Sequence, residues 1–158
     1  MCGLVGFLTT NKDFIFNNNE LKKMSRSLKH RGPDDENFID IDKKLYLAHQ
    51  RLSILDISKN GAQPMISSSG RFIIAFNGEI YNHLKIRKEI LKYKSLIWRG
   101  TSDTETLIES FEILGLKKTL DKISGMFAFA LIDKLNNKLY LARDAIGEKP
   151  IYYGYNHK

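Results

Sequence analysis

The hydrophobic pattern predicts strands whose two faces are both apolar. The predicted strands at residues 71–77 and 126–133 carry apolar side chains at the consecutive positions 72–76 and 126–132, so both faces of each extended strand are hydrophobic. Asn136-Asn137 separates the second segment from residues 138–144, which is typical of an antiparallel hairpin. Antiparallel sheets normally leave one face in water, so these strands need a second sheet on one side and helices on the other. We therefore expect an α/β (α+β) fold, a four-layer α/β/β/α sandwich of two antiparallel sheets.

The other elements follow from capping and turn signals. Ser102-Asp103-Thr104-Glu105 has the spacing of a capping box and precedes apolar residues at helical intervals. A second helix is expected at residues 79–93, with Ile80, Leu84 and Leu91 facing inward. The remaining expected elements are a helix at 19–29, strands at 3–8 and 151–155, and short strands within 37–57 that turn at Asp42-Lys43-Lys44.

Composition narrows the class of protein. A chain of 158 residues suits one domain, and its single cysteine excludes an internal disulfide and fits a reducing cytoplasm. The longest apolar run, residues 126–132, is far shorter than the roughly 20 residues of a membrane helix, so we expect no membrane segment. The net charge of +7 raises the question of nucleic acid, but the basic residues are scattered over predicted helix faces. We expect neither nucleic-acid binding nor a metal site among the four histidines.

Cys2 is the candidate nucleophile. Removal of Met1 would make this only cysteine the amino terminus. A thiol with a pKa of about 8.5 and an α-amine with a pKa of about 7.7–8.0 would then belong to one residue. Nucleophile and base would thus come together without a histidine. By position alone, the better explanation is a small apolar residue that opens a buried strand.

Three further segments carry candidate binding groups. The guanidinium of Arg51 can hold a carboxylate with two parallel hydrogen bonds. Asn77-Gly78-Glu79 is expected to end a strand and open a helix, where a side-chain amide, a backbone N–H and a helix amino terminus favour developing negative charge. Asp103, at another helix start, can accept hydrogen bonds from an ammonium group. Together these groups would recognise both ends of an α-amino acid.

Each of these residues also has a simpler explanation. Arg51 alone fits a surface ion pair, Asn77-Gly78 a turn, Asp103 a helix cap and Glu79 a helix-dipole partner. Only their joint occurrence with Cys2, in one order along the chain, favours the chemical explanation.

That ordered set resembles the glutamine-hydrolysing domain of class II glutamine amidotransferases, which are N-terminal-nucleophile hydrolases. The resemblance covers essentially the whole chain and is strongest to the asparagine synthetase branch. The motifs that carry it are Met1-Cys2-Gly3, Arg31-Gly32-Pro33-Asp34-Asp35, Arg51-Leu52-Ser53-Ile54, Asn77-Gly78-Glu79-Ile80-Tyr81-Asn82, Ser102-Asp103-Thr104-Glu105, and Arg143-Asp144 with Gly147 and Lys149-Pro150.

The resemblance implies a role for each predicted site residue. Cys2, freed by loss of Met1, would attack the side-chain amide of glutamine, while the Asn77 side chain and the Gly78 N–H would form the oxyanion hole. Arg31, Asp34 and Asp35 are expected to brace a stiff turn without a catalytic task. The predicted substrate-binding residues are Arg51, Leu52, Ser53 and Ile54 for the α-carboxylate and pocket wall, Asn77, Gly78 and Glu79 from the next motif, and Asp103, which with Glu79 would hold the α-amine.

The resemblance also implies a partner. Residues 1–158 would form a cytoplasmic glutaminase domain without a cofactor, and its ammonia would go to an ATP-dependent synthetase domain or subunit that is absent from this sequence. ATP and Mg are expected only in that synthetase domain, and a homodimer is left open. The expected acceptor is aspartate, in asparagine synthesis. Alternatives are another carboxylate such as a surface-polysaccharide sugar acid, a catalytically silent glutamine-binding module, or a cysteine peptidase, which fits poorly with a pocket for one free amino acid.

Overall fold

Two antiparallel sheets form the centre of the protein. The computed structural model describes residues 2–11 and 18–155. The first sheet has the strand order β1-β3-β2 and the second β4-β5-β6-β7. The strands are β1 (Gly3–Leu8), β2 (Asp35–Ile41), β3 (Leu45–Arg51), β4 (Met65–Ile66), β5 (Phe72–Ile80), β6 (Gly125–Asp133) and β7 (Lys138–Arg143).

The two predicted tight turns are confirmed. Asp42 and Lys43 follow β2 with φ of 54° at both residues, and Asn137 precedes β7 with φ of 51°. Positive φ values are what short hairpin connections need, because they match the right-handed twist of the strands. Both sheets therefore contain the hairpins that the sequence pattern indicates.

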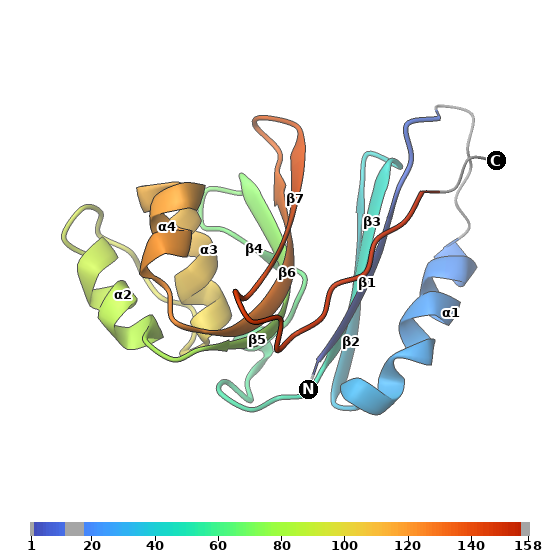
Figure 1. The fold of residues 1–158 in the computed structure, drawn as a ribbon, viewed down its shortest axis with the longest axis horizontal. Helices are drawn as coiled ribbons and strands as arrows, with labels where there is room; N and C mark the ends of the chain where they lie inside the picture. Colours follow the sequence, from blue (N-terminus) through green and yellow to red (C-terminus); the bar gives the residue numbers. More distant parts are fainter. Residues whose placement is uncertain (1, 12–17, 156–158) are drawn as a thin grey trace.

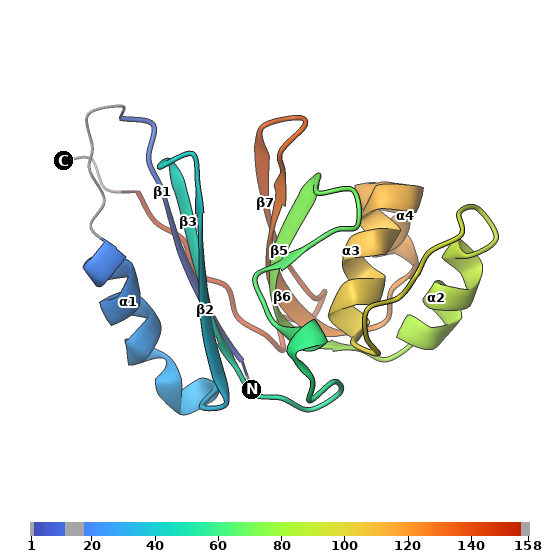
Figure 2. The same cartoon turned by 180° about the vertical axis from the view of Figure 1, so that it is seen from behind.

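The helices cover the outer faces of the sheets. Figures 1 and 2 show α1 against the first sheet, the other three α-helices on the outer side of the second, where α2 packs on α3, and the two sheets face to face between them. This arrangement confirms the predicted α/β/β/α sandwich. The helices are α1 (Asn18–Ser27), α2 (His83–Ile90), α3 (Asp103–Leu114) and α4 (Leu116–Lys122), with short 3-10 turns η1 (Lys29–Arg31) and η2 (Lys59–Gly61).

The core has two apolar layers on either side of β5 and β6. Because successive strand residues point to opposite faces, alternate β5 residues enter different layers. Ile73 and Ala75 pack with Leu45 and Leu47 between the sheets. On the opposite face of the second sheet, Phe72, Ile74 and Phe76 pack with Leu107, Ile108 and Phe111 of α3.

The helix expected at residues 79–93 is wrong at its beginning. β5 continues to Ile80, because its ladder with β6 extends to the Ile80–Gly125 pair. Asn77, Gly78 and Glu79 therefore lie inside a strand and do not open a helix. The helix begins only at His83, and it buries Ile86 and Ile90, whereas Leu84 and Leu91 are exposed.

The strand expected at residues 151–155 does not form. Asp144 still bonds to Phe127 of β6, but the chain then leaves this sheet and, as Figure 1 shows, runs past β1 without joining the first sheet. Tyr152 and Tyr153 are 90% and 75% exposed, so their apolar rings do not belong to a buried sheet face. Apolar content alone was an insufficient signal because a strand also needs a neighbouring ladder.

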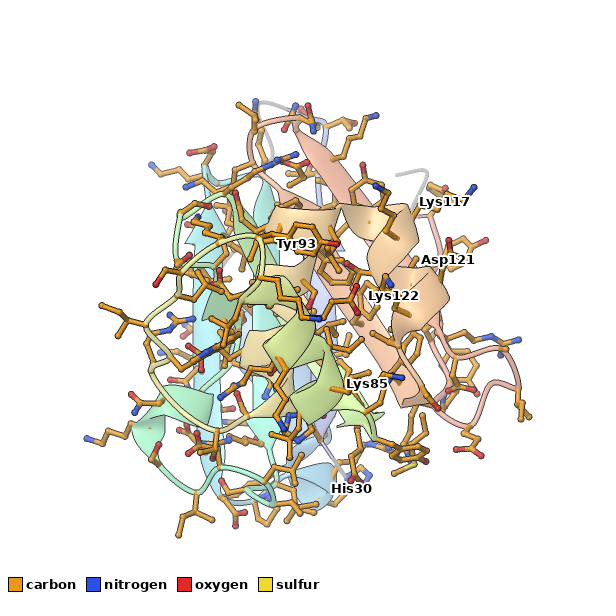
Figure 3. The ribbon with its side chains drawn as sticks, turned by 90° about the vertical axis from the view of Figure 1, so that its left-hand side faces the viewer. His30, Lys85, Tyr93, Lys117, Asp121 and Lys122 are labelled. Atoms are coloured by element: carbon orange, nitrogen blue, oxygen red, sulfur yellow. The ribbon has the colours of Figure 1, made fainter. Side chains whose placement is uncertain are left out.

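Charged side chains cover the outer helices. Figure 3 shows this face, with Lys85 on α2, Lys117, Asp121 and Lys122 on α4, and Tyr93 after α2. Lys122 forms an ion pair with Glu89 at 2.9 Å across the two helices. In the described part of the chain, no helix is long and apolar enough to cross a bilayer.

Candidate active site

Three inward-facing rows of side chains end at the same side of the gap between the sheets. Leu4 packs against the layer that contains Leu47 of β3 and Ala75 of β5. Side chains two residues apart on a strand share a face. Continued along the chain, these three rows end in Cys2, Arg51 and Asn77.

A pocket of about 100 Å³ opens at this end. It brings together residues from the start of β1, the end of β3, the middle of β5 and the start of α3. Ser53 does not line it. The predicted site residues that line the pocket are Cys2, Arg51, Leu52, Ile54, Asn77, Gly78, Glu79 and Asp103.

The Cys2 thiol lies against the segment that follows β3. The Leu52 N–H donates to Cys2 Sγ at 3.4 Å, and Sγ lies 3.7 Å from the Leu52 carbonyl oxygen. Burial raises the pKa of the thiol above its ordinary value, and the Leu52 hydrogen bond and the Arg51 charge oppose this rise only in part. The thiol therefore needs a base before it can attack.

The guanidinium of Arg51 is buried and held by the loop behind it. Its Nη1 donates to the Ser58 carbonyl at 2.9 Å, and its Nη2 donates to the Asp56 carbonyl. A Cβ at Gly61 would clash with Nη2, so this close packing requires glycine there. An arginine side chain has five N–H donors, of which these bonds use two. Arg51 thus enters the pocket as a fixed cation with donors to spare.

The Arg31–Asp35 turn contacts both Cys2 and the segment that follows β3. Arg31 Nε donates to the Cys2 carbonyl at 3.2 Å. Asp34 Oδ2 accepts the Ser53 N–H at 2.8 Å, and the Asp34 N–H donates to the Arg51 carbonyl at 3.0 Å. The Asp34 carboxylate therefore anchors the backbone of Ser53, although Ser53 itself does not line the pocket.

One edge of β5 presents backbone N–H groups to the pocket. The Phe76 N–H donates to Gln63 Oε1 at 2.7 Å, and the Ile80 N–H donates to Asp103 Oδ2 at 2.8 Å. Residues two apart on a strand direct their N–H groups to the same edge. The N–H of Gly78, midway between them, consequently points toward the pocket.

Asp103 is the first residue of α3 and is 5% exposed. The Ser102 half of the predicted capping box is confirmed, because the Ser102 side chain accepts the Glu105 N–H at 3.2 Å, whereas the Glu105 carboxylate accepts the Arg99 and Gly100 N–H groups at 2.9 and 3.0 Å. Burial raises the pKa of Asp103, while the Ile80 N–H opposes this rise. A cation bound beside this carboxylate would favour its ionised form.

His49 joins the two sheets below the pocket. Its Nε2 lies 3.0 Å from the Phe76 carbonyl oxygen, and its Nδ1 has no partner among the described residues. Burial lowers the pKa of His49 from 6.5 to about 4. The imidazole is therefore neutral at pH 7, with Nε2 as the donor to Phe76.

Several pocket residues escaped the sequence prediction. Gln63, Met126 and Lys149 line the pocket beside the predicted set. Lys149 belongs to a quoted motif, and its position depends on Asp144, which accepts N–H groups from Gly147, Glu148 and Lys149 at 2.6 to 3.0 Å. Gln63 had no local signal, because an isolated glutamine in a loop is indistinguishable from a surface residue.

Comparison with known proteins identifies related chains. A family model described as a glutamine amidotransferase domain matches residues 1–158. A Bacillus subtilis protein named asparagine synthetase [glutamine-hydrolyzing] 2 is 38% identical over 157 residues, covering 97% of this chain and 20% of its own length. Asparagine synthetases [glutamine-hydrolyzing] of Sandersonia aurantiaca and Arabidopsis thaliana are 38% and 36% identical over 98% of this chain, and 28% and 26% of their own lengths are covered. The chain thus spans only about a quarter of these relatives.

Replacing Gly78 with alanine is expected to destabilise the protein. A Cβ there would clash with the Met126 carbonyl and lie 2.7 Å from Phe127 Cα, and neither backbone atom can move without disturbing β6. We expect a loss of about 1–3 kcal/mol in the free energy of unfolding, measured with urea. Gly154→Ala is the control, because nothing lies within 4 Å of its added Cβ. Equal stability of the two variants would contradict the close approach of β5 and β6.

Acid should destabilise the protein partly through His49. The pKa of His49 is near 4 in the folded state and near 6.5 when exposed, so the unfolded chain binds the extra proton between these values. Stability attributable to His49 should be complete well above pH 6.5 and fall by about 2.5 kcal/mol by pH 4.5. Urea unfolding of the wild type and His49→Gln at pH 7 and 4.5 isolates this contribution. The same acid sensitivity in both proteins would exclude His49 as its source.

Proposed function

Because this chain belongs to the glutamine amidotransferase domain family, we propose that it hydrolyses the side-chain amide of glutamine and releases glutamate and ammonia. The observation that carries the proposal is the single pocket that gathers Cys2, Arg51, Gly78 and Asp103. A thiol, a buried cation, an N–H group that points into the pocket and a buried carboxylate together match the groups of one free amino acid that carries a side-chain amide.

The proposed reaction passes through a thioester on Cys2. After removal of Met1, the α-amine of Cys2 takes the thiol proton, and Sγ attacks the amide carbon of glutamine. The C–N bond then breaks, and the leaving nitrogen takes a proton from the α-ammonium and departs as ammonia. Water cleaves the C–S bond, giving glutamate and the free thiol. A base is needed because burial raises the pKa of the thiol. The α-amine can supply it, since it belongs to the same residue and its ordinary pKa lies near neutral pH.

The proposed oxyanion hole consists of the Gly78 N–H and the Asn77 side-chain amide. The direction of the Gly78 N–H, between the engaged N–H groups of Phe76 and Ile80, supports this role. Asn77 is buried and lines the same pocket. Donors fixed before the reaction need no reorganisation when negative charge develops, and one such donor is typically worth about 2.7–4 kcal/mol of barrier.

The proposed contacts of the substrate α-groups follow the charges of the pocket. Arg51, held by two backbone carbonyls, would bind the α-carboxylate. Asp103 and Glu79 would bind the α-ammonium, which also offsets the cost of burying the Asp103 carboxylate. Leu52 and Ile54 would form the wall between these ends.

We further propose that the ammonia serves an ATP-dependent synthetase that amidates aspartate. The names of the relatives, which are asparagine synthetases [glutamine-hydrolyzing], support this acceptor. The glutaminase step itself requires only protein groups and water. A catalytically silent glutamine-binding module would bind the same amino acid but form no thioester, so covalent chemistry separates the two functions.

Covalent labelling tests the nucleophile. Protein lacking Met1, incubated with an electrophilic glutamine analogue, should gain the mass of one adduct on Cys2, as measured by mass spectrometry. Cys2→Ala should form no adduct and lose at least about a thousandfold in glutamate release. Protein that retains Met1 should be inactive, since its base is blocked. Turnover by Cys2→Ala, or glutamine binding by the wild type without adduct or glutamate, would contradict the enzyme.

Replacement of Asp103 tests recognition of the α-amine. Asp103→Asn keeps an acceptor for the Ile80 N–H but removes the charge that would meet the ammonium, so KM for glutamine should rise about 10- to 100-fold with a much smaller change in kcat. Because burial raises the pKa of Asp103, wild-type binding should weaken on acidification earlier than an ordinary carboxyl would predict. Asp121→Asn, on the α4 surface in Figure 3, is the control. An unchanged KM in Asp103→Asn would remove this residue from the site.

A further inference from the structure

The backbone of β5 at Phe76 lacks a strand partner on its pocket side. β4 pairs with β5 only through Met65–Ile74 and Ile66–Ile73. Extending this register would bring Gln63 opposite Phe76, but the ladder has already ended there. The Phe76 N–H is bound by the Gln63 side chain at 2.7 Å, and the Phe76 carbonyl lies 3.0 Å from His49 Nε2. Two buried side chains thus replace a missing strand immediately before Asn77 and Gly78.

Gln63 also reaches the start of α3. Its Nε2 donates to Thr104 Oγ1 at 3.3 Å, and Thr104 follows Asp103 directly. Gln63 and Thr104 are 5% and 3% exposed, so both hydrogen bonds lie away from solvent. The Gln63 carboxamide uses its oxygen in one bond and its nitrogen in the other. Loss of either bond would leave a buried polar atom unsatisfied, so the carboxamide fixes the separation of β5 and the start of α3.

We propose that Gln63 is a positioning residue for glutamine hydrolysis, whose carboxamide ties the strand that carries Asn77 and Gly78 to the helix start that carries Asp103. This assignment rests on the proposed function, since it concerns the distance between the oxyanion donors and the amine-binding carboxylate. The hydrogen bond from the Phe76 N–H to Gln63 Oε1, here called the acceptor arm, holds β5 and affects the reacting amide. The hydrogen bond from Gln63 Nε2 to Thr104 Oγ1, here called the donor arm, holds α3 and affects binding of the α-ammonium.

The two arms have separable kinetic signatures. Thr104→Val removes only the donor arm and leaves a side chain of nearly the same shape. We therefore expect KM for glutamine to rise about 3- to 10-fold while kcat stays within about twofold. Gln63→Met removes both arms, so KM should rise by a similar factor and kcat should also fall about 10-fold. Thr104→Ser keeps the hydroxyl and should restore the wild-type KM.

A double-mutant cycle identifies the shared contact. If Thr104 acts through Gln63, the double variant Gln63→Met/Thr104→Val should have the KM of Gln63→Met, because its donor arm is already lost. Steady-state glutamate release measures all four proteins. KM effects that multiply in the double variant would show that Thr104 acts independently of Gln63, and the proposal would be wrong.

Gln50→Met is the matched control for loss of a buried amide. Gln50 is 3% exposed, and its Nε2 donates to Ser25 Oγ at 2.9 Å, on the α1 side of the first sheet. We expect it to lower the free energy of unfolding as Gln63→Met does, with kcat and KM unchanged. If Gln63→Met changes stability alone, as Gln50→Met does, Gln63 is only structural. If the wild type neither labels with the electrophilic analogue nor releases glutamate, the proposed function fails first.

Discussion

The apolar layer between the two sheets is the constraint on which the rest of the structure depends. Leu47 of β3 and Ala75 of β5 pack there with side chains from every second position of the neighbouring strands. The same period of two that buries these residues directs Cys2, Arg51 and Asn77 toward one end of the gap. Packing and chemistry therefore share one register, and the site needs no special loop to bring residues from the two sheets together.

The polar groups around this layer are arranged so that little of the site can move alone. Arg51 is held by backbone carbonyls of the loop that follows it, and Asp56 in that loop also accepts the Thr101 N–H at 2.8 Å, just before α3. The Ser58 hydroxyl bound to Asp56 contributes most to lowering the pKa of that carboxyl. The Arg51 cation, the loop that holds it and the start of α3 thus form one connected network. The Cys2 thiol differs from these groups, because burial raises its pKa and disfavours its charged form.

The sequence predicted the layers from local periodicity, and it predicted most of the pocket from motifs whose order along the chain resembles that of the glutamine amidotransferase domain. The strands β5 and β6 are apolar on both faces, so both faces needed cover, and this requirement predicted the sandwich. Of the site residues predicted from the motifs, all but Ser53 line the pocket. Ser53 does not line the pocket, and its backbone N–H is instead bound by the carboxylate of Asp34, 19 positions away in the sequence. Elements that depend on distant partners were missed: β5 runs on through Glu79 only because β6 pairs with it. Residues 151–155 form no strand, since no described strand pairs with them.

The alternation along β1 also limits how the chain can start. Leu4 faces the other sheet, so Cys2 does as well, and Gly3 between them faces α1, where a Cβ would lie 2.8 Å from Leu28 Cβ. One residue inserted after Cys2 would turn the sulfur to the α1 face of the sheet. The number of residues between the thiol and the first strand therefore acts as a parity rule, because a change of length by one residue reverses the face to which the sulfur points.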